Sequence, residues 1–523
     1  MKRSPAQFRE AIVQTIGRAY FEQRPAWQEY QRRYLKPEGA RIFAWEHTVF
    51  TDEFPHWFGN IVGNCPHLAV RQYLIENMYV EEVKDPTIPV GHHESMVDFA
   101  EALGLPRRDV MRYGGQIHTR MALNYWDDVS RTKPWLEAFA GIGGLELTNS
   151  AAVREALGAP PNTSKVWAPL GLSGKAMAHF EAGEAADAYE GGHGDETMEI
   201  LVKYAATEEQ QDAVLKVLDE SLRVLAFQMD CIGWGAFEAS GLWPLPPDVP
   251  RRAEYLMNGW RNKGRRERVF QNGRSRKRAP AQFREELIQT VGRAFLEEPP
   301  AMFDFAFNHV NPAGAKFFAR EHCVFADEFP HWFGNMVGNC PVFPVRQYMI
   351  GNMYVEEVKD PTIDEGHYES MVNFAIALGY RRDEIVGYKG QLHTRMALSY
   401  WDDVSRTKPW LQAFAAVGGS ELANSAEIAH RYGLKPINAA EVWAPLGLKG
   451  KAMAHWEAGE AADTHEGGHG DETLNLLVKY ADTAEKQDAV RDSMEESLRV
   501  LAFQMDLLGQ AAFEASGMKG RQH

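Results

Sequence analysis

Apolar residues recur at three- and four-residue spacing along much of the chain, with polar residues between them. The pattern is clearest in FREAIVQTIGRAYFE, AVRQYLIENMYVEE, HESMVDFAEALGL and ESLRVLAFQMD, which begin at residues 8, 69, 93 and 220. This is the period of amphipathic α-helices, and no convincing segment alternates with the period of a strand. The pattern predicts helices of about 12–20 residues joined by short loops, and hence an all-α fold of helical bundles.

The helical pattern occurs twice. PAQFREAIVQTIGRAYFE begins at residue 5 and PAQFREELIQTVGRAFLE at residue 280, and DEFPHWFGN begins at residues 52 and 327. Solenoid repeats are shorter, about 20–50 residues, so this period indicates duplicated domains. We predict domains over 1–240 and 279–523, joined by a linker over 241–278 that begins proline-rich and ends basic. We interpret the linker as solvated chain, the alternative being an arm that wraps the other copy or binds an anionic surface.

The composition limits the number of domains, the class of partner and the cellular location that we expect. The 523 residues exceed what one hydrophobic core usually organises. A net charge of −16 argues against a nucleic-acid binder, which needs a basic face. The four cysteines form no CxxC pair, and no apolar run is long enough for a signal peptide or a membrane span. We therefore expect a cytoplasmic protein that acts on a small molecule and binds neither nucleic acid nor membrane.

The first candidate chemical group combines Glu81 with His92. Glu81 follows Asn77 by one helical turn in ENMYVEE, and His92 begins a helix whose apolar face continues through Met96 and Phe99. The second copy repeats these residues as Glu356 and His367. The plain alternative is that Glu81 is a surface helix acid.

The second candidate is Glu146 in AFAGIGGLELTNS, which returns as Glu421. Small apolar residues precede it, and a carboxylate that enters such a buried stretch needs a cation or a metal. The alternative is a helix-terminal acid that makes a local cap.

The third candidate is the acidic stretch AADAYEGGHGDE. Glu190 and His193 form a Glu-x-x-His pair, the spacing found in carboxylate-bridged di-metal bundles. Asp187 lies one turn earlier and joins them if the helix is distorted. The second copy offers Asp463, Glu466 and His469.

Taken together, each copy offers four carboxylates and two imidazoles on separate helices. Oxygen and nitrogen ligands without thiolate suit iron or manganese better than structural zinc. Further duplicated side chains are candidates for supporting the ligands or contacting substrate, the alternative being ordinary core packing: His56, His118, Trp126 and Asp127, with His331, His393, Trp401 and Asp402.

At these residues the chain resembles the haem-oxygenase-like diiron oxidases and oxygenases, relatives of the TenA and PqqC fold. The carrying features are FPHWFGN, the N-x-x-x-E of Asn77–Glu81, His92 followed by Phe99 and ALG, the mid-domain Glu146, and the late acid and histidine helix. The resemblance covers nearly all of each copy. It implies two seven-helix bundles that pair within one chain as a pseudo-dimer, so that the chain can be monomeric.

The resemblance also implies two irons per domain, held by Glu81, His92, Glu146 and the Asp187, Glu190 and His193 group, and by their counterparts in the second copy. One departure concerns the late helix, where the family carries His-x-x-x-Asp-x-x-His. Alignment on His193 and alignment on Phe180 assign its ligands differently, and His179 and His455 are further alternatives. The ligands of this helix therefore stay open.

The implied activity is O2-dependent oxidation by a non-haem Fe(II)/Fe(III) centre, either N-oxygenation, desaturation or oxidative C–C cleavage in specialised biosynthesis. We expect an amino-acid-derived substrate, with an external reductant as one option. Two alternatives remain: a metal-independent enzyme like PqqC or TenA, and a non-catalytic iron-binding module. A zinc hydrolase fits poorly, because HHESM lacks the second histidine of H-E-x-x-H.

Overall fold

The computed structural model describes residues 2–82, 85–161, 163–187, 193–251, 254–264, 276–360, 362–463 and 469–519. By its internal contacts the chain divides into two compact units, Met1–Arg251 and Arg252–His523. Each unit is described by itself. The described residues of both are helical and contain no β-strand, apart from an isolated bridge between Asp360 and Glu365. The all-α expectation is confirmed.

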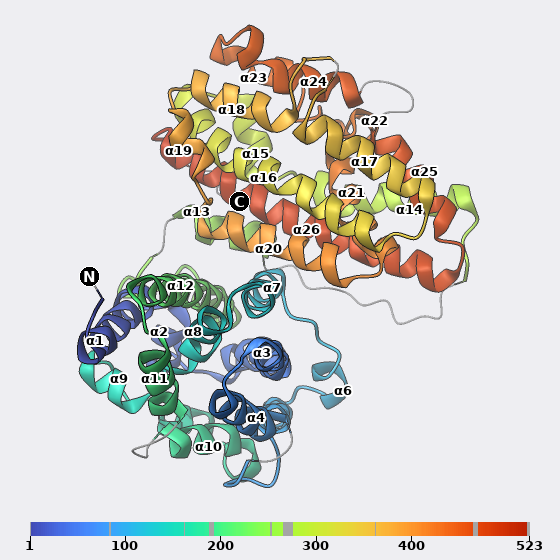
Figure 1. Ribbon diagram of the computed structural model, residues 1–523. Coiled ribbons are helices and arrows are strands. Elements are labelled where there is room, and N and C mark those ends of the chain that lie inside the picture. The colour runs from blue at the N-terminus through green and yellow to red at the C-terminus, as the bar shows by residue number, and fades with distance from the viewer. Residues whose placement is uncertain are drawn as a thin grey trace. The chain divides into compact units, whose positions relative to one another are not determined.

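The described residues of the first unit form twelve α-helices, most of them labelled in Figure 1, with short π and 3-10 segments between them, named α and η in chain order. They are α1 (Pro5–Ile16), η1 (Gly17–Phe21), α2 (Ala26–Arg33), α3 (Pro37–Asn64), α4 (Leu68–Glu82), α5 (His92–Ala102), α6 (Arg107–Val110), α7 (Ile117–Thr132), α8 (Trp135–Glu146), α9 (Ala151–Ala156), η2 (Ser164–Leu170), η3 (Gly174–Ala176), α10 (Ala178–Asp187), α11 (His193–Tyr204) and α12 (Glu208–Ala239).

The second unit repeats this order after a short extra helix. Its elements are α13 (Glu254–Gly259), η4 (Trp260–Gly264), α14 (Pro280–Val291), η5 (Gly292–Leu296), α15 (Ala301–Asp304), η6 (Phe305–His309), α16 (Pro312–Asn339), α17 (Phe343–Glu357), α18 (His367–Ala377), α19 (Arg382–Val386), α20 (Leu392–Thr407), α21 (Trp410–Glu421), η7 (Leu422–Asn424), α22 (Ala426–Arg431), α23 (Ala440–Trp443), η8 (Ala444–Leu446), η9 (Gly450–Ala452), α24 (Ala454–Asp463), α25 (His469–Tyr480) and α26 (Ala484–Ala515).

Two long helices organise each bundle. In the first unit α12 packs against α2, α3 and α8, while α3 also contacts α4, α5 and α7 (Figure 1). In the second unit α26 and α16 hold the corresponding places. The start of α12 is fixed by a capping box, in which the Thr207 side chain accepts from the Gln210 amide.

Small residues let α8 approach α12 closely. A Cβ at Gly144 would lie 2.3 Å from Leu218 Cδ1, and one at Gly141 would lie 3.0 Å from Val217 Cγ1. The AFAGIGGLE segment therefore packs as a buried helix, and Glu146 is its last residue. This packing is what brings the carboxylate of Glu146 to the interior of the bundle.

Two details differ from the sequence-based expectation. The helices α3 and α12 are 28 and 32 residues long, beyond the expected range, and α3 continues through Pro55 because packing on its neighbours offsets the local cost. Part of the expected solvated linker is structured, since α13 and η4 pack on α26 and Trp260 is buried. The domain limits inferred from the duplication, 1–240 and 279–523, remain a prediction.

The sequence predicts no membrane-spanning segment, and the longest helices test this prediction. None of the helices in the described part of the chain is both long and apolar enough to cross a bilayer.

Candidate functional site

Each unit encloses a cavity among its long helices. The first unit's cavity has a volume of about 270 Å³, and the second unit's has about 160 Å³. Aromatic side chains of α3 form much of the first wall, among them Phe43, Phe50 and Phe54. An apolar enclosure with a few polar groups directed into it is the usual form of a small-molecule site.

His92 lies at the wall of the first cavity between two carboxylates. It begins α5, Glu81 lies in the last turn of α4, and Asp85 lies in the connection between them. The Nδ1 atom of His92 is 2.9 Å from Glu81 Oε1, and its Nε2 atom is 2.9 Å from Asp85 Oδ2. Asp85 is held in turn by the backbone amide of Thr87, at 2.6 Å.

The two carboxylates set the charge of His92. Burial disfavours the imidazolium, but the charge of Glu81 and the hydrogen bonds to Asp85 and Glu81 outweigh it and raise the pKa of His92 to about 10. Burial likewise opposes charge on Asp85, yet its hydrogen bonds with His92 and Thr87 lower its pKa. Without a competing cation, both ring nitrogens of His92 therefore donate to carboxylates.

The second unit reproduces this arrangement. His367 Nδ1 is 2.9 Å from Glu356 Oε1, and His367 Nε2 is 2.8 Å from Asp360 Oδ2. Burial again opposes the charge, and the two carboxylates raise the pKa of His367 to about 9. Both copies thus keep a carboxylate–imidazole–carboxylate row at the edge of a cavity.

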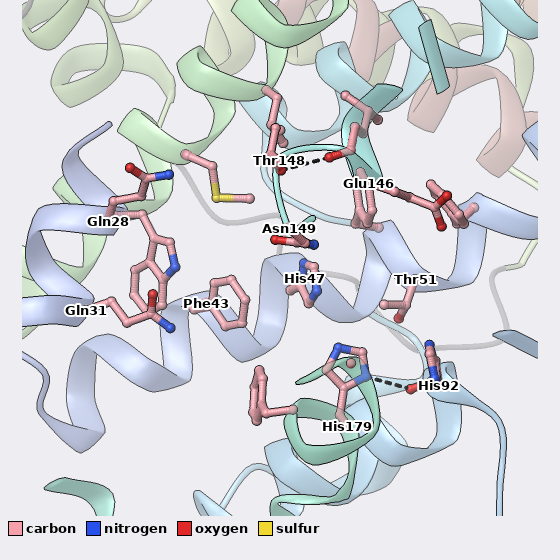
Figure 2. Close-up of a pocket in the computed structure, with 18 of the residues that line it drawn as sticks. Gln28, Gln31, Phe43, His47, Thr51, His92, Glu146, Thr148, Asn149 and His179 are labelled. Carbon is pink, nitrogen blue, oxygen red and sulfur yellow. Dashed lines mark hydrogen bonds between the residues drawn. The ribbon is translucent and has the colours of Figure 1, made fainter. Parts of the chain in front are cut away.

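Two further histidines line the first cavity. His47 belongs to α3 and His179 to α10, and their ring centroids are 5.7 Å apart, while His179 lies 5.6 Å from His92. Burial lowers the pKa of His47 to about 4, and burial together with the positive charge of His92 lowers that of His179. The Nδ1 atom of His47 is buried and makes no hydrogen bond within the described part of the chain. Figure 2 draws His47, His92 and His179 around one cavity.

The second cavity has the same pair of neutral imidazoles. His322 and His455 line it, with ring centroids 5.6 Å apart. Burial lowers the pKa of His322 to about 4 and that of His455 well below the usual histidine range.

Glu146 and Glu421 also line the two cavities. Each is the last residue of its helix, and the Oε2 atom of each is buried. Burial and the charge of Glu146 raise the pKa of the nearby Tyr73 phenol. The structure therefore brings Glu81, His92 and Glu146 to one cavity, and Glu356, His367 and Glu421 to the other.

The late-helix candidates lie at the limit of the description. Glu190 and Glu466 fall outside the described residues. Asp187 and Asp463 end α10 and α24, and His193 and His469 begin α11 and α25, but their side chains are likewise outside the description. Which of these acids and histidines reaches the cavity stays a prediction.

Two of the supporting candidates stand behind the cavity wall. The indole NH of Trp126 donates to Ser221 Oγ at 2.8 Å, and its ring packs edge-on against Phe50, which lines the cavity. Asp127 pairs with Arg131 at 2.6 Å. Trp401 and Asp402 make the same contacts with Ser497, Phe325 and Arg406. These residues belong to the packing around the site and are absent from the cavity lining in the described residues.

The histidine candidates His56 and His118 lie elsewhere. His56 is a surface residue of α3, with its side chain 67% exposed and its Nδ1 atom 3.1 Å from Glu53, so the expected contact with the site is wrong. His331 pairs with Glu328 in the same exposed way. His118 and His393 are buried, but neither is among the described residues that line these two cavities.

The donor atoms suit a metal ion of the iron or manganese type. Each cavity combines carboxylate oxygen with imidazole nitrogen, and the four cysteines are buried at other places. Among the described side chains, no three His, Cys, Asp or Glu residues already surround one point closely enough to hold an ion. His92 and Glu81 instead contact each other directly, and the late-helix acids are outside this comparison.

Sequence reasoning missed His47 and Asp85. His47 lies in the apolar segment FAWEHTVF, which returns as FAREHCVF with His322, and a histidine in such a stretch reads as core packing. Asp85 lies in the repeated VKDPTI, outside the helical pattern. The retention of both residues in the second copy was the available signal.

Comparison with known proteins gives a family match and two fold similarities. Residues 41–226 match the family described as iron-containing redox enzyme. No curated protein matches the chain. A domain of unknown function with a haem-oxygenase-like fold from Shewanella denitrificans is similar at 17% identity over 46% of this chain and 95% of that one, with a TM-score of 0.35. A TenA homologue from Pseudomonas syringae pv. tomato is similar at 12% identity over 45% of this chain and 98% of that one, with a TM-score of 0.34.

Proposed function

We propose that this chain, whose residues 41–226 match the family described as iron-containing redox enzyme, is an O2-dependent non-haem diiron oxygenase or oxidase. Its substrate is a small amino-acid-derived molecule, and its reaction is N-oxygenation or oxidative C–C cleavage in specialised metabolite biosynthesis. The observation that carries the proposal is the His92 row, in which Glu81 Oε1 lies 2.9 Å from Nδ1 while Asp85 takes Nε2.

The His92 row fits a metal ligand. A histidine that binds a metal usually donates its other ring N–H to a carboxylate, which fixes the ring and its tautomer. Asp85 stands in that place, so Nε2 would keep its proton and Nδ1 would be the ring nitrogen that binds a cation. Glu81 and His92 would then be ligands of one iron, and Asp85 would orient the imidazole.

Further donors in the cavity support a second iron. The buried carboxylate of Glu146 and the neutral imidazoles of His47 and His179 line the same space. Their low pKa values keep the two imidazoles unprotonated at neutral pH, which is the form that binds metal. We therefore propose two irons in each domain, with the second unit using Glu421, His322 and His455.

The protein's own part in the chemistry is binding, orientation and exclusion of water. Iron in this cavity would supply the redox chemistry by which O2 oxidises an organic substrate. The aromatic side chains of Phe43, Phe50 and Phe54 keep the site dry and leave a defined space for a small molecule. The carboxylate of Asp85 accepts a hydrogen bond from Nε2 of His92, and this hydrogen bond fixes the orientation of the ring.

The test is O2 consumption by protein loaded with Fe(II) without air. We expect O2 use that depends on an amino-acid-derived substrate and disappears on chelation. The double substitution Glu81→Ala with Glu356→Ala should lower the rate by more than about 100-fold, because it removes a ligand from each site. The matched control Glu76→Ala changes an exposed acid of the same helix and should leave the rate unchanged.

Each rival activity gives a different result in this assay. Full activity after chelation would identify a metal-independent enzyme. Iron binding without substrate-dependent O2 use would identify a non-catalytic iron-binding module. No buried cysteine thiol lines either cavity in the described residues, and burial raises the pKa of Cys65 and Cys340, so a thiolate mechanism finds little support.

A further inference from the structure

The two cavities have the same donor residues at one end, but different residues line the other end. Five donor residues face both cavities in equivalent positions, from Glu81, His92, Glu146, His47 and His179 to their second-unit counterparts. We propose that the first domain binds a polar, carboxylate-bearing substrate and the second an apolar one. This inference rests on the proposed function and adds the substrate class of each domain.

The first difference lies on α2 and η1. The segment PAWQEYQ at 25–31 corresponds to PAMFDFA at 300–306, and both begin a helix that is capped from the last helix of the bundle. Gln28 and Gln31 line the first cavity, and Figure 2 draws them at the end away from His92. Their counterparts are Phe303 and Ala306.

The phenol of Tyr20 adds to this polar wall. It lines the first cavity, and the same position in the second cavity is Phe295. Burial raises the pKa of Tyr20, while the charge of Arg154 and a hydrogen bond with Gln28 pull it down in part. Tyr20, Gln28 and Arg154 are therefore neighbours on one wall.

Arg154 gives the first cavity a positive charge. Its Nε atom donates to the Thr148 carbonyl at 2.7 Å and its Nη1 atom to the Pro160 carbonyl at 2.6 Å, which fixes the guanidinium at the wall. The corresponding residue is Ala429, because AAVREALG returns as AEIAHRYG. A guanidinium anchored in this way is suited to a carboxylate.

Three hydroxyl-bearing residues of the first cavity are also replaced by apolar residues in the second copy. Thr51, Thr163 and Ser164 line the first cavity, and the second copy has Ala326, Ala439 and Ala440. Each of these three changes removes a polar group from the second copy, whereas Leu145 of the first cavity corresponds to Ser420 of the second, a change in the opposite direction.

The second cavity is smaller and has an apolar far wall. Phe303 packs on Phe295 with ring centroids 5.6 Å apart, and Ile437, Leu501 and Leu508 line the space beyond. Its volume of about 160 Å³ compares with about 270 Å³ in the first unit.

Among the described residues that line the second cavity there is no lysine or arginine. Asn438 and Gln504 are uncharged, and the carboxylate of Glu321 accepts from Gln391 N at 2.9 Å and from Thr394 Oγ1 at 2.7 Å. In the described part of this wall a substrate carboxylate would meet no cationic side chain, whereas an apolar group would be well accommodated.

Two probes of matched size test the proposal. L-norleucine carries an ammonium and a carboxylate, and hexan-1-ol has the same carbon chain without them. Their binding to the full-length, Fe(II)-loaded chain is measured by titration calorimetry without O2, and the iron content of each sample is measured in parallel. We expect norleucine to bind in the first domain and hexan-1-ol in the second.

Substitutions then locate each probe. Arg154→Ala should weaken norleucine binding by about 10- to 100-fold, the range of a lost hydrogen bond to a charged group, and leave hexan-1-ol binding unchanged. Gln28→Phe with Gln31→Ala installs the second unit's residues and should act in the same direction. This second variant keeps the test sound if Arg154→Ala disturbs folding, which circular dichroism would reveal. Gln14→Ala, an exposed change on α1, is the control.

Placing the first unit's polar residues in the second unit should create a new norleucine site there. Phe303→Gln, Ala306→Gln and Ala429→Arg together should create norleucine binding in the second domain and double the molecules bound per chain. Absent norleucine binding, or norleucine binding that ignores all these substitutions, would overturn the proposal. Selective binding in protein that holds no iron would instead contradict the proposed function and leave the polarity assignment standing.

Discussion

His92 is the residue on which the account of the site depends most. One ring nitrogen faces Glu81 and the other faces Asp85, each at 2.9 Å. The row occurs again at His367 with Glu356 and Asp360. A ring held from both sides cannot rotate freely, and this fixes which nitrogen is available to a metal.

Asp85→Asn should weaken iron binding in the first domain by about 10- to 100-fold, because the ring of His92 loses the carboxylate that orients it. The measurement is competition with a metal-sensitive fluorescent chelator under anaerobic conditions. Asp109→Asn, an exposed change on α6, is the matched control. Unchanged affinity in Asp85→Asn would show that Asp85 has no part in the site.

Residue by residue, the sequence predicted part of this site. Glu81, His92 and Glu146 stood out because acids and a histidine recur at the same places in apolar helical segments of both copies. Asp85 was missed because its role depends on a nitrogen on the far side of the ring, which only the fold reveals. His56 was misassigned, since its exposed side of α3 cannot be distinguished from the buried side by its duplication alone.

At the scale of elements, α2 is the helix that carries the polar wall, and α12 holds it in place. Asp230 Oδ1 accepts from the Ala26 amide at 2.7 Å, and a Cβ at Gly233 would lie 2.2 Å from the Trp27 nitrogen. The second unit repeats both contacts with Asp506 and Gly509.

Gly233→Ala should destabilise the first domain by about 1–3 kcal/mol, because the added methyl group meets backbone atoms that cannot move aside. Thermal unfolding followed by circular dichroism measures the change. The control Gly351→Ala places a methyl group in open space within α17 and should stabilise by about 1 kcal/mol through helix propensity. Equal effects of the two substitutions would contradict the close approach of α2 and α12.

The helix α2 is also held by an ion pair that responds to pH. Burial disfavours the charged form of Glu29, but hydrogen bonds from Arg24 and Arg33 outweigh this effect and lower its pKa. A lowered pKa means that the carboxylate stabilises the fold above its unfolded pKa of about 4.3 and loses this effect as pH falls through the lowered folded value.

Glu29→Gln should therefore cost about 1.5–3 kcal/mol at neutral pH, the range for hydrogen bonds to charged groups. The difference from the wild-type protein should shrink as the pH is lowered below about 4.3. Unfolding curves across this range measure both quantities. A difference that stays constant into acid would show that the Glu29 charge is not its cause.

Element types were more predictable than element limits. Apolar spacing identified the helices that carry Glu81 and His92, and the small apolar residues before Glu146 indicated its buried segment. It did not indicate that α3 continues past Pro55, because a proline inside a helix usually ends it and only packing with other helices offsets that cost. The sequence predicts a linker over 241–278, whereas residues 254–264 of it are helical and bury Trp260.

At the scale of the whole molecule, the chain consists of two units that repeat one architecture and retain the same donor residues. We propose that the pair forms the two-fold assembly within a single chain. The chain should then sediment as a monomer of 59.0 kDa, which analytical ultracentrifugation measures. Sedimentation as a stable dimer would contradict the proposal that the two-fold assembly forms within a single chain.

Substitutions in one unit should leave the other unit's site intact. Glu81→Ala with Glu146→Ala should abolish iron binding in the first unit, and Glu356→Ala with Glu421→Ala should do so in the second, because each pair removes ligand oxygens from one cavity only. If the units carry out different oxidations, each double variant should lose a different product, as mass spectrometry of the reaction would show.

The central claim is that iron binds at the carboxylate and histidine end of both cavities. The most direct measurement is the iron content of protein loaded with Fe(II) and desalted without air, compared between the wild-type chain and these variants. The account predicts that either double variant retains half the wild-type iron and that the combined variant retains almost none. Iron content that is unchanged by all four substitutions, or no iron retained by the wild-type chain, would contradict it.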